Sequence, residues 1–189
     1  MSSLPPTLPP LARLPTLRPG RPPRVVLDTA AVLSALLFGG GASARLRRGW
    51  QIGLCRPLLC KATLQDLMGA LAQPRLGLTG FEQRQLLRDY LPHALRVRLP
   101  EVDRGLSMSP SSIPSTSLTP GPPAAAGEPV ALAFVRLAMA GKAHVLVSAD
   151  TEVQTLDGRL GDCQVMALDP FLAALAAAGI QPLPLRRRR

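Results

Sequence analysis

Short apolar runs alternate with amphipathic stretches over most of the chain. Val25, Val26 and Leu27 form an apolar run that ends at Asp28, which is typical of a strand buried in a parallel sheet. A second clear run covers residues 143–148 and is followed closely by Asp150. The same pattern predicts further strands over residues 54–60, 94–97 and 164–168.

Helices are expected between these strands. Leu64, Leu67, Met68 and Leu71 recur at the i, i+3, i+4, i+7 spacing that places them on one face of a helix over residues 62–72. Other helices are expected around residues 29–37, 43–50, 79–90, 128–139, 152–156 and 170–178. The local signals for helix ends are a glycine break at 39–41, Ser43 as an N-cap, Thr79 with Glu82 as a capping box, and Gly141 as a C′ residue.

Alternating strands and helices predict a mostly parallel sheet with helices on both faces, a three-layer α/β/α sandwich. In such sheets, ligand sites lie beyond the carboxyl ends of the strands. Asp28 and Asp150 each follow a strand, so we expect them to converge at one crevice. Carboxylates held close together repel one another, and a bound Mg²⁺ or Mn²⁺ ion relieves that repulsion. The alternative is that Asp28 only caps the helix that follows it.

The composition divides the chain into one domain and three additional segments. Proline recurs every few residues over 1–23, which predicts a disordered extension. Residues 105–127 are rich in serine and proline and carry no periodicity, which predicts a loop insertion. Residues 181–189 form a basic tail. One domain is therefore expected over residues 24–180, interrupted by the insertion.

The chain carries a formal net charge of +10, which favours a polyanionic partner. Arg45, Arg47 and Arg48, on the helix after the glycine break, could contact RNA phosphates, or they could form an ordinary solvated helix face. The three cysteines show no disulfide or zinc spacing, so buried free thiols are expected. No apolar run is long enough for a membrane span and no signal peptide is evident, so we expect a cytoplasmic protein without a membrane partner.

Four segments follow one another in a recognisable order: VVLDTAAVLSALLFGGGASARLRRGW from Val25, then ATLQDLMGALAQPRLGL, LAMAGKAHVLVSADTEVQTL and VMALDPFLAAL. Over roughly residues 24–175 the chain resembles the PIN-domain family, and within it the VapC-like group of toxin–antitoxin ribonucleases. The resemblance implies a three-layer α/β/α fold and metal-dependent cleavage of RNA. It also implies a small antitoxin protein as a partner and a homodimer.

Carried over residue by residue, the resemblance makes Asp28, Asp66 and Asp150 the catalytic carboxylates that hold Mg²⁺ or Mn²⁺. Glu152 stands where the family usually has a second aspartate, and Glu128 opens the family's central acidic segment, so both could assist in holding the metal.

Three positions depart from the pattern of the family. Ala30 replaces an asparagine two residues after the first aspartate, and Ala131 replaces a metal ligand. Asp66 is one methylene shorter than the usual glutamate. These departures favour the alternative of a catalytically degenerate module that binds RNA or a protein partner without cleavage. A small-molecule enzyme is disfavoured, because Gly39–Gly41 follow a helix and not the first strand.

Overall fold

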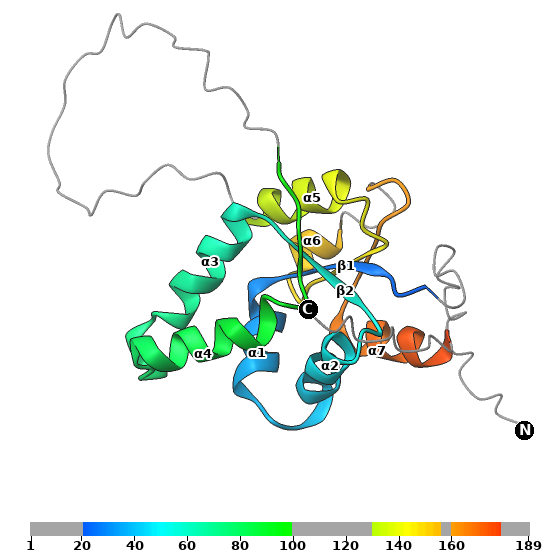
Figure 1. The fold of residues 1–189 in the computed structure, drawn as a ribbon. Helices are drawn as coiled ribbons and strands as arrows, with labels where there is room; N and C mark the ends of the chain where they lie inside the picture. Colours follow the sequence, from blue (N-terminus) through cyan, green and yellow to red (C-terminus); the bar gives the residue numbers. More distant parts are fainter. Residues whose placement is uncertain (1–20, 100–129, 156–159, 179–189) are drawn as a thin grey trace, which may run out of the picture.

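The computed structural model describes residues 21–99, 130–155 and 160–178 (Figure 1). The insertion expected at 105–127, the basic tail at 181–189 and nearly all of the proline-rich extension lie outside the described residues. Pro23, the last residue of that expected extension, is fully buried, and its carbonyl accepts a hydrogen bond from Arg56 N at 2.8 Å. The folded region therefore already includes this proline.

One parallel sheet of five strands forms the centre of the fold. Its order is β3-β2-β1-β4-β5, and every neighbouring pair is parallel, as the alternating pattern predicts. Val26 at the centre of the sheet pairs with Leu58 on one side and with Leu146 on the other. The strands are β1 (Arg24–Leu27), β2 (Arg56–Leu59), β3 (Leu95–Arg96), β4 (Val145–Val147) and β5 (Gln164–Met166).

Helices cover both faces of this sheet and confirm the three-layer α/β/α sandwich. The helices are α1 (Thr29–Leu37), α2 (Gly41–Gln51), α3 (Lys61–Leu71), α4 (Gly80–Tyr90), α5 (Val130–Ala140), α6 (Thr151–Gln154) and α7 (Leu168–Ala177), with a 3₁₀ turn η1 (Pro74–Leu76). In Figure 1, α1, α2 and α7 lie on one side of β1 and β2, and α5 and α6 lie on the other. Buried residues of α1, α2, α3, α4 and α7 join one core cluster, and those of α5 and α6 join a second.

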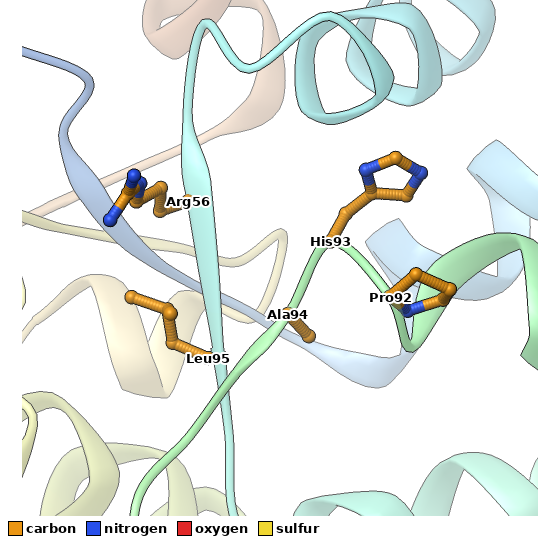
Figure 2. Close-up of a pocket in the computed structure, with 5 residues that line it drawn as sticks. All are labelled: Arg56, Pro92, His93, Ala94 and Leu95. Atoms are coloured by element: carbon orange, nitrogen blue, oxygen red, sulfur yellow. The ribbon is translucent and has the colours of Figure 1, made fainter. Parts of the chain in front are cut away.

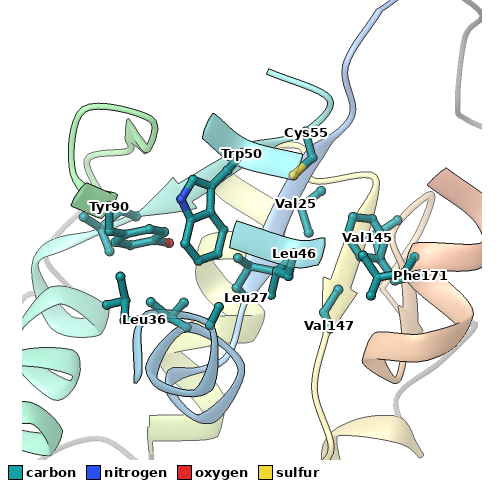
Figure 3. Close-up of a cluster of buried hydrophobic side chains, with 14 of the residues drawn as sticks. Val25, Leu27, Leu36, Leu46, Trp50, Cys55, Tyr90, Val145, Val147 and Phe171 are labelled. Carbon is teal, nitrogen blue, oxygen red and sulfur yellow. The ribbon is translucent and has the colours of Figure 1, made fainter. Parts of the chain in front are cut away.

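Side chains alternate between the two clusters along the buried strands β1 and β4. Val25 and Leu27 enter the first cluster, whereas Val26 enters the second. This alternation follows from the two-residue repeat of a strand, and it explains why a strand covered on both faces is apolar throughout. In the first cluster the indole of Trp50 meets the ring of Tyr90 edge to face, with ring centroids 5.2 Å apart (Figure 3).

The capping box predicted at Thr79 is confirmed. The side chain of Thr79 accepts from Glu82 N at 3.3 Å, and Glu82 Oε2 accepts from Thr79 N at 2.8 Å. The hydrogen bonds that the backbone N–H and the hydroxyl of Thr79 donate to the Glu82 carboxylate stabilise its charged form and lower its pKa. The prediction for Ser43 is wrong: α2 begins at Gly41 with Gly40 as its N-cap, so Ser43 lies in the first helical turn. Gly41 can start the helix at this point because its φ of 64° lies in the left-handed region, which glycine adopts without a steric penalty.

The end of α5 corrects the role expected for Gly141. The residue with a left-handed backbone is Lys142, with a φ of 48°, so Lys142 and not Gly141 occupies the C′ position. Lys142 N donates to Met139 O at 3.1 Å and Ala143 N donates to Ala138 O at 2.8 Å, the two hydrogen bonds of a Schellman motif. Gly141 is the residue before Lys142. A side chain at position 141 is excluded for another reason, the close packing of this position against strand β2.

Cys55, Cys60 and Cys163 are buried free thiols, as expected. Burial raises the pKa of Cys55 to about 12, because the thiolate would lose its hydration in the core. At pH 8 only about one Cys55 thiol in ten thousand would then be ionised in the native state.

We expect a disulfide reagent added at pH 8 to modify none of the three thiols rapidly in the native protein, and all three at once in 6 M guanidinium. The absorbance of the released thiolate measures both rates. Prompt modification of one native thiol would show that at least one cysteine is accessible, contrary to this packing.

Within the described residues, no single helix is long and apolar enough to cross a membrane. α1 and α2 reach that length and apolar character only when they are taken together, and the two helices are bent by 95° at the break between them.

Candidate active site at the carboxyl edge of the sheet

Asp28 lies directly after β1 and links two parts of the fold. Its Oδ1 accepts a hydrogen bond from Ala31 N at 2.7 Å, which makes it the N-cap of α1. Its Oδ2 accepts from Ala149 N at 3.2 Å, in the loop that follows β4. The side chain is buried, with only 9% of its surface exposed. The capping role left open by the sequence is therefore present, and the second hydrogen bond also ties Asp28 to the end of β4.

Asp66 reaches the same edge from α3. Its Oδ2 accepts a hydrogen bond from the hydroxyl of Thr29, the first residue of α1. Thr29 follows Asp28 in the chain, so this contact brings the Asp66 carboxylate to the start of α1. The packing of α1 against α3 thus links Asp66 to the residue after Asp28, although the two acids are far apart in the sequence.

Asp150 completes this edge from the loop between β4 and α6. Its side chain is exposed, and its backbone N–H donates to Ser148 Oγ at 3.1 Å. Ser148 is a buried polar residue directly after β4, and its carbonyl accepts from Gln154 Nε2 at 2.9 Å. Ser148 was not among the predicted site residues. Its position at the end of a strand was the available signal, although serine by itself points to no particular chemistry.

The acidic side chains at this edge match a divalent metal ion in the kind of donor atom but not in their grouping. Carboxylate oxygens are the ligands that Mg²⁺ and Mn²⁺ prefer, so the chemistry of the donors fits. Their number falls short: among the described residues, no three His, Cys, Asp or Glu side chains gather closely enough to hold a metal ion. The remaining predicted ligands, Glu128 and the side chain of Glu152, lie outside the described residues. The three described aspartates therefore do not by themselves form a complete metal site.

The two alanine positions differ in what the structure shows. Ala30 lies in the first turn of α1 beside Asp28 and is exposed, so its methyl group stands where the family pattern has a polar amide. Ala131 belongs to the first turn of α5, and its side chain lies outside the described residues.

The three arginines of α2 have different surroundings. Arg47 Nε donates to Asp89 Oδ2 at 2.8 Å and its Nη1 donates to Leu36 O at 3.5 Å, so this side chain joins α2 to α4 and α1. Arg45 forms a longer, exposed ion pair with Asp169 at 3.7 Å. Within the described part of the chain, Arg48 alone of the three has no ion pair. The predicted RNA contacts on this helix are thus partly engaged in holding the fold together.

A five-stranded parallel sheet between two helical layers, with acidic side chains at its carboxyl edge, defines a three-layer α/β/α protein with a candidate acidic site. A scan against protein-family models matches the PIN domain over residues 24–152, which includes all three aspartates. The chain therefore belongs to the PIN domain family. Comparison with curated proteins found no match.

Proposed function

We propose that this PIN domain protein is a metal-dependent endoribonuclease that hydrolyses RNA phosphodiester bonds, and that it is the toxin of a toxin–antitoxin pair. The observation that carries the proposal is the acidic carboxyl edge, where Asp28, Asp66 and the loop of Asp150 are joined by hydrogen bonds through Thr29 and Ala149. On this proposal a small antitoxin protein and a second copy of the chain are its partners.

In this proposal Asp28, Asp66 and Asp150 would hold Mg²⁺ or Mn²⁺, with Glu152 or Glu128 completing the set. A divalent ion bound there supplies Lewis-acid chemistry to a phosphodiester. The protein contributes orientation: Ala31 N and Ala149 N each hold one oxygen of Asp28, so its carboxylate cannot rotate freely. The hydroxyl of Thr29 fixes Asp66 in the same way.

The test is cleavage of a labelled single-stranded RNA with Mg²⁺ or Mn²⁺, compared with the same reaction in EDTA. Asp150→Asn should lower the rate about a hundredfold, because it removes a charge that acts on the reacting phosphate. The exposed position of Asp150 makes a folding defect unexpected. Asp162→Asn is the matched control, since Asp162 is also exposed but precedes β5 at the amino edge of the sheet.

A second candidate function is a non-catalytic module that binds RNA or a protein. It is favoured by the absence of a three-acid group among the described residues and by Ala30. Calorimetric titration of the native chain with Mn²⁺ separates the two. Binding that disappears in Asp28→Asn supports the nuclease, whereas no binding together with no cleavage above the EDTA background supports the module.

A further inference from the structure

Exposed arginines occur on α4 and on the edge strand β3, which follows it in the chain. Arg84 and Arg88 on α4 and Arg96 on β3 are all exposed. The ion pairs found within the described residues are Arg45–Asp169 and Arg47–Asp89, so none of these three takes part in one. Among the described residues, therefore, no carboxylate forms an ion pair with the positive charge of this part of the surface.

The acids of the same segment are already engaged. Between residues 74 and 99 the chain has two acidic residues, Glu82 and Asp89. The Glu82 carboxylate accepts from the backbone and hydroxyl of Thr79, both at 2.8 Å. Asp89 accepts from Arg47 Nε at 2.8 Å and from Gln51 Nε2 at 2.9 Å, on the side of α4 that faces α2. Among the described residues, neither acid forms an ion pair with Arg84 or Arg88.

An exposed aromatic ring shares this face of α4. The chain has six aromatic residues, of which Trp50, Tyr90, Phe134 and Phe171 are buried. The other two are exposed: Phe38, after α1, leaves 60% of its surface exposed, and Phe81, on α4, leaves 61%. Phe81 precedes Arg84 by three residues and Arg88 by seven, so the three side chains lie along one side of the helix. An exposed ring beside guanidinium groups offers both stacking and phosphate contacts.

A hollow lies where α4 leads into β3. Its volume is about 370 Å³, and it is lined by Arg56, Pro92, His93, Ala94 and Leu95. Figure 2 shows Arg56 and Leu95 extending to one side of β2, with His93 and Pro92 on the other. The guanidinium and the imidazole therefore flank the hollow and do not converge on one point. That arrangement suits successive phosphates of a strand, with an apolar wall for a base or sugar between them.

We propose that single-stranded RNA binds this α4–β3 surface, defined as Phe81, Arg84, Arg88, Arg96 and the hollow between Arg56 and His93. Arginines without ion pairs supply the phosphate contacts that dominate affinity for nucleic acids, and the exposed ring of Phe81 stacks on a base. The inference rests on the proposed function for the identity of the ligand, and it moves the main RNA contacts from α2 to α4 and β3.

The experiment measures binding of a fluorescent single-stranded RNA of about 12 nucleotides to the full chain by anisotropy, in EDTA so that no cleavage occurs. Arg84→Glu/Arg88→Glu should weaken binding at least tenfold. It should also reduce the slope of log affinity against log salt by about 1.4, because two phosphate contacts are lost. The control Arg45→Glu/Arg48→Glu makes the same change of charge on α2 and should weaken binding less than threefold.

Phe81→Ala separates stacking from charge. It should weaken RNA binding about fivefold or more, since one stacked base contributes about 1–3 kcal/mol. Binding of heparin, a polyanion without bases, should stay unchanged in this variant. Equal losses for RNA and heparin would contradict a stacking role for the ring. Thermal melting by circular dichroism checks the fold, and Arg84→Gln/Arg88→Gln repeats the test should the charge reversal disturb it.

The proposal is overturned if the α4 variant binds RNA like the native chain, if the α2 control loses as much, or if the native chain does not bind single-stranded RNA. Failure of this surface proposal and failure of the proposed nuclease function give different results. RNA binding through α4 without cleavage in Mg²⁺ or Mn²⁺ would remove the nuclease and keep this surface. Cleavage with an unchanged KM in Arg84→Glu/Arg88→Glu would keep the nuclease and remove the surface.

Discussion

Asp28→Asn should lower the rate of RNA cleavage about a thousandfold while changing the free energy of unfolding by only about 1 kcal/mol. The asparagine oxygen can still accept from Ala31 N, so the N-cap of α1 survives. Its amide nitrogen cannot accept from Ala149 N, but Ala149 is exposed and water can take that place. The variant therefore removes the charge of the site and keeps most of the contacts that support the fold.

Asp28→Ala should be measured beside Asp28→Asn. It removes both hydrogen bonds, so the loss of the cap and of the link to the β4–α6 loop should together destabilise the protein by about 2–3 kcal/mol. Rates of cleavage under saturating RNA and urea unfolding curves measure the two effects independently. Full activity in Asp28→Asn, together with instability in Asp28→Ala, would show that Asp28 is a helix cap and not part of a catalytic site.

Gly141→Ala should destabilise the fold by about 1–3 kcal/mol, although alanine is the better residue within a helix. A Cβ atom at this position would lie 2.5 Å from Leu58 Cδ1 and 2.9 Å from the carbonyl oxygen of Leu137. Leu58 is buried in the second core cluster with 2% of its surface exposed, so it has little room to retreat. The Leu137 oxygen is backbone and already accepts from Gly141 N at 2.9 Å.

Gly69→Ala provides the matched control. Gly69 lies within α3 and is exposed, and a Cβ atom there would meet nothing within 4 Å beyond the backbone of its own helix. Here the substitution should stabilise the protein by about 0.5–1 kcal/mol, because only the helix propensity changes. Urea unfolding of the two variants should give shifts of opposite sign. A Gly141→Ala variant as stable as the native chain would mean that β2 and α5 are less closely packed than the structure shows.

Local signals predicted much of the fold. The strand ending at Asp28, the helix stripe of Leu64 and Leu67, and the capping box of Thr79 and Glu82 all depend on residues within a few positions of one another. Their hydrogen bonds and periodicity are decided by local backbone geometry, so the sequence alone was sufficient to predict them. Ser43 shows the limit even here, because Gly40 and Gly41 start the helix before it.

The candidate site was predicted less completely. The sequence indicated Asp28, Asp66 and Asp150 through their positions and the family pattern, but it did not indicate that Thr29 and Ala149 join them. For Arg47 the sequence left two possibilities open, a contact with RNA phosphates and an ordinary solvated helix face. Its engagement with Asp89 depends on how α4 packs against α2.

The sequence by itself determined the parallel α/β/α fold, the acidic residues at the strand ends and the capping box of Thr79 and Glu82, because each follows from the chemistry of near neighbours. Only the tertiary structure decided which arginines keep their charge uncompensated, and why position 141 excludes a side chain. Asp89 lies far from Arg47 in the sequence, and Leu58 lies far from Gly141. Contacts of this kind arise when separate elements pack, and neither residue type nor local spacing specifies which distant atoms will meet.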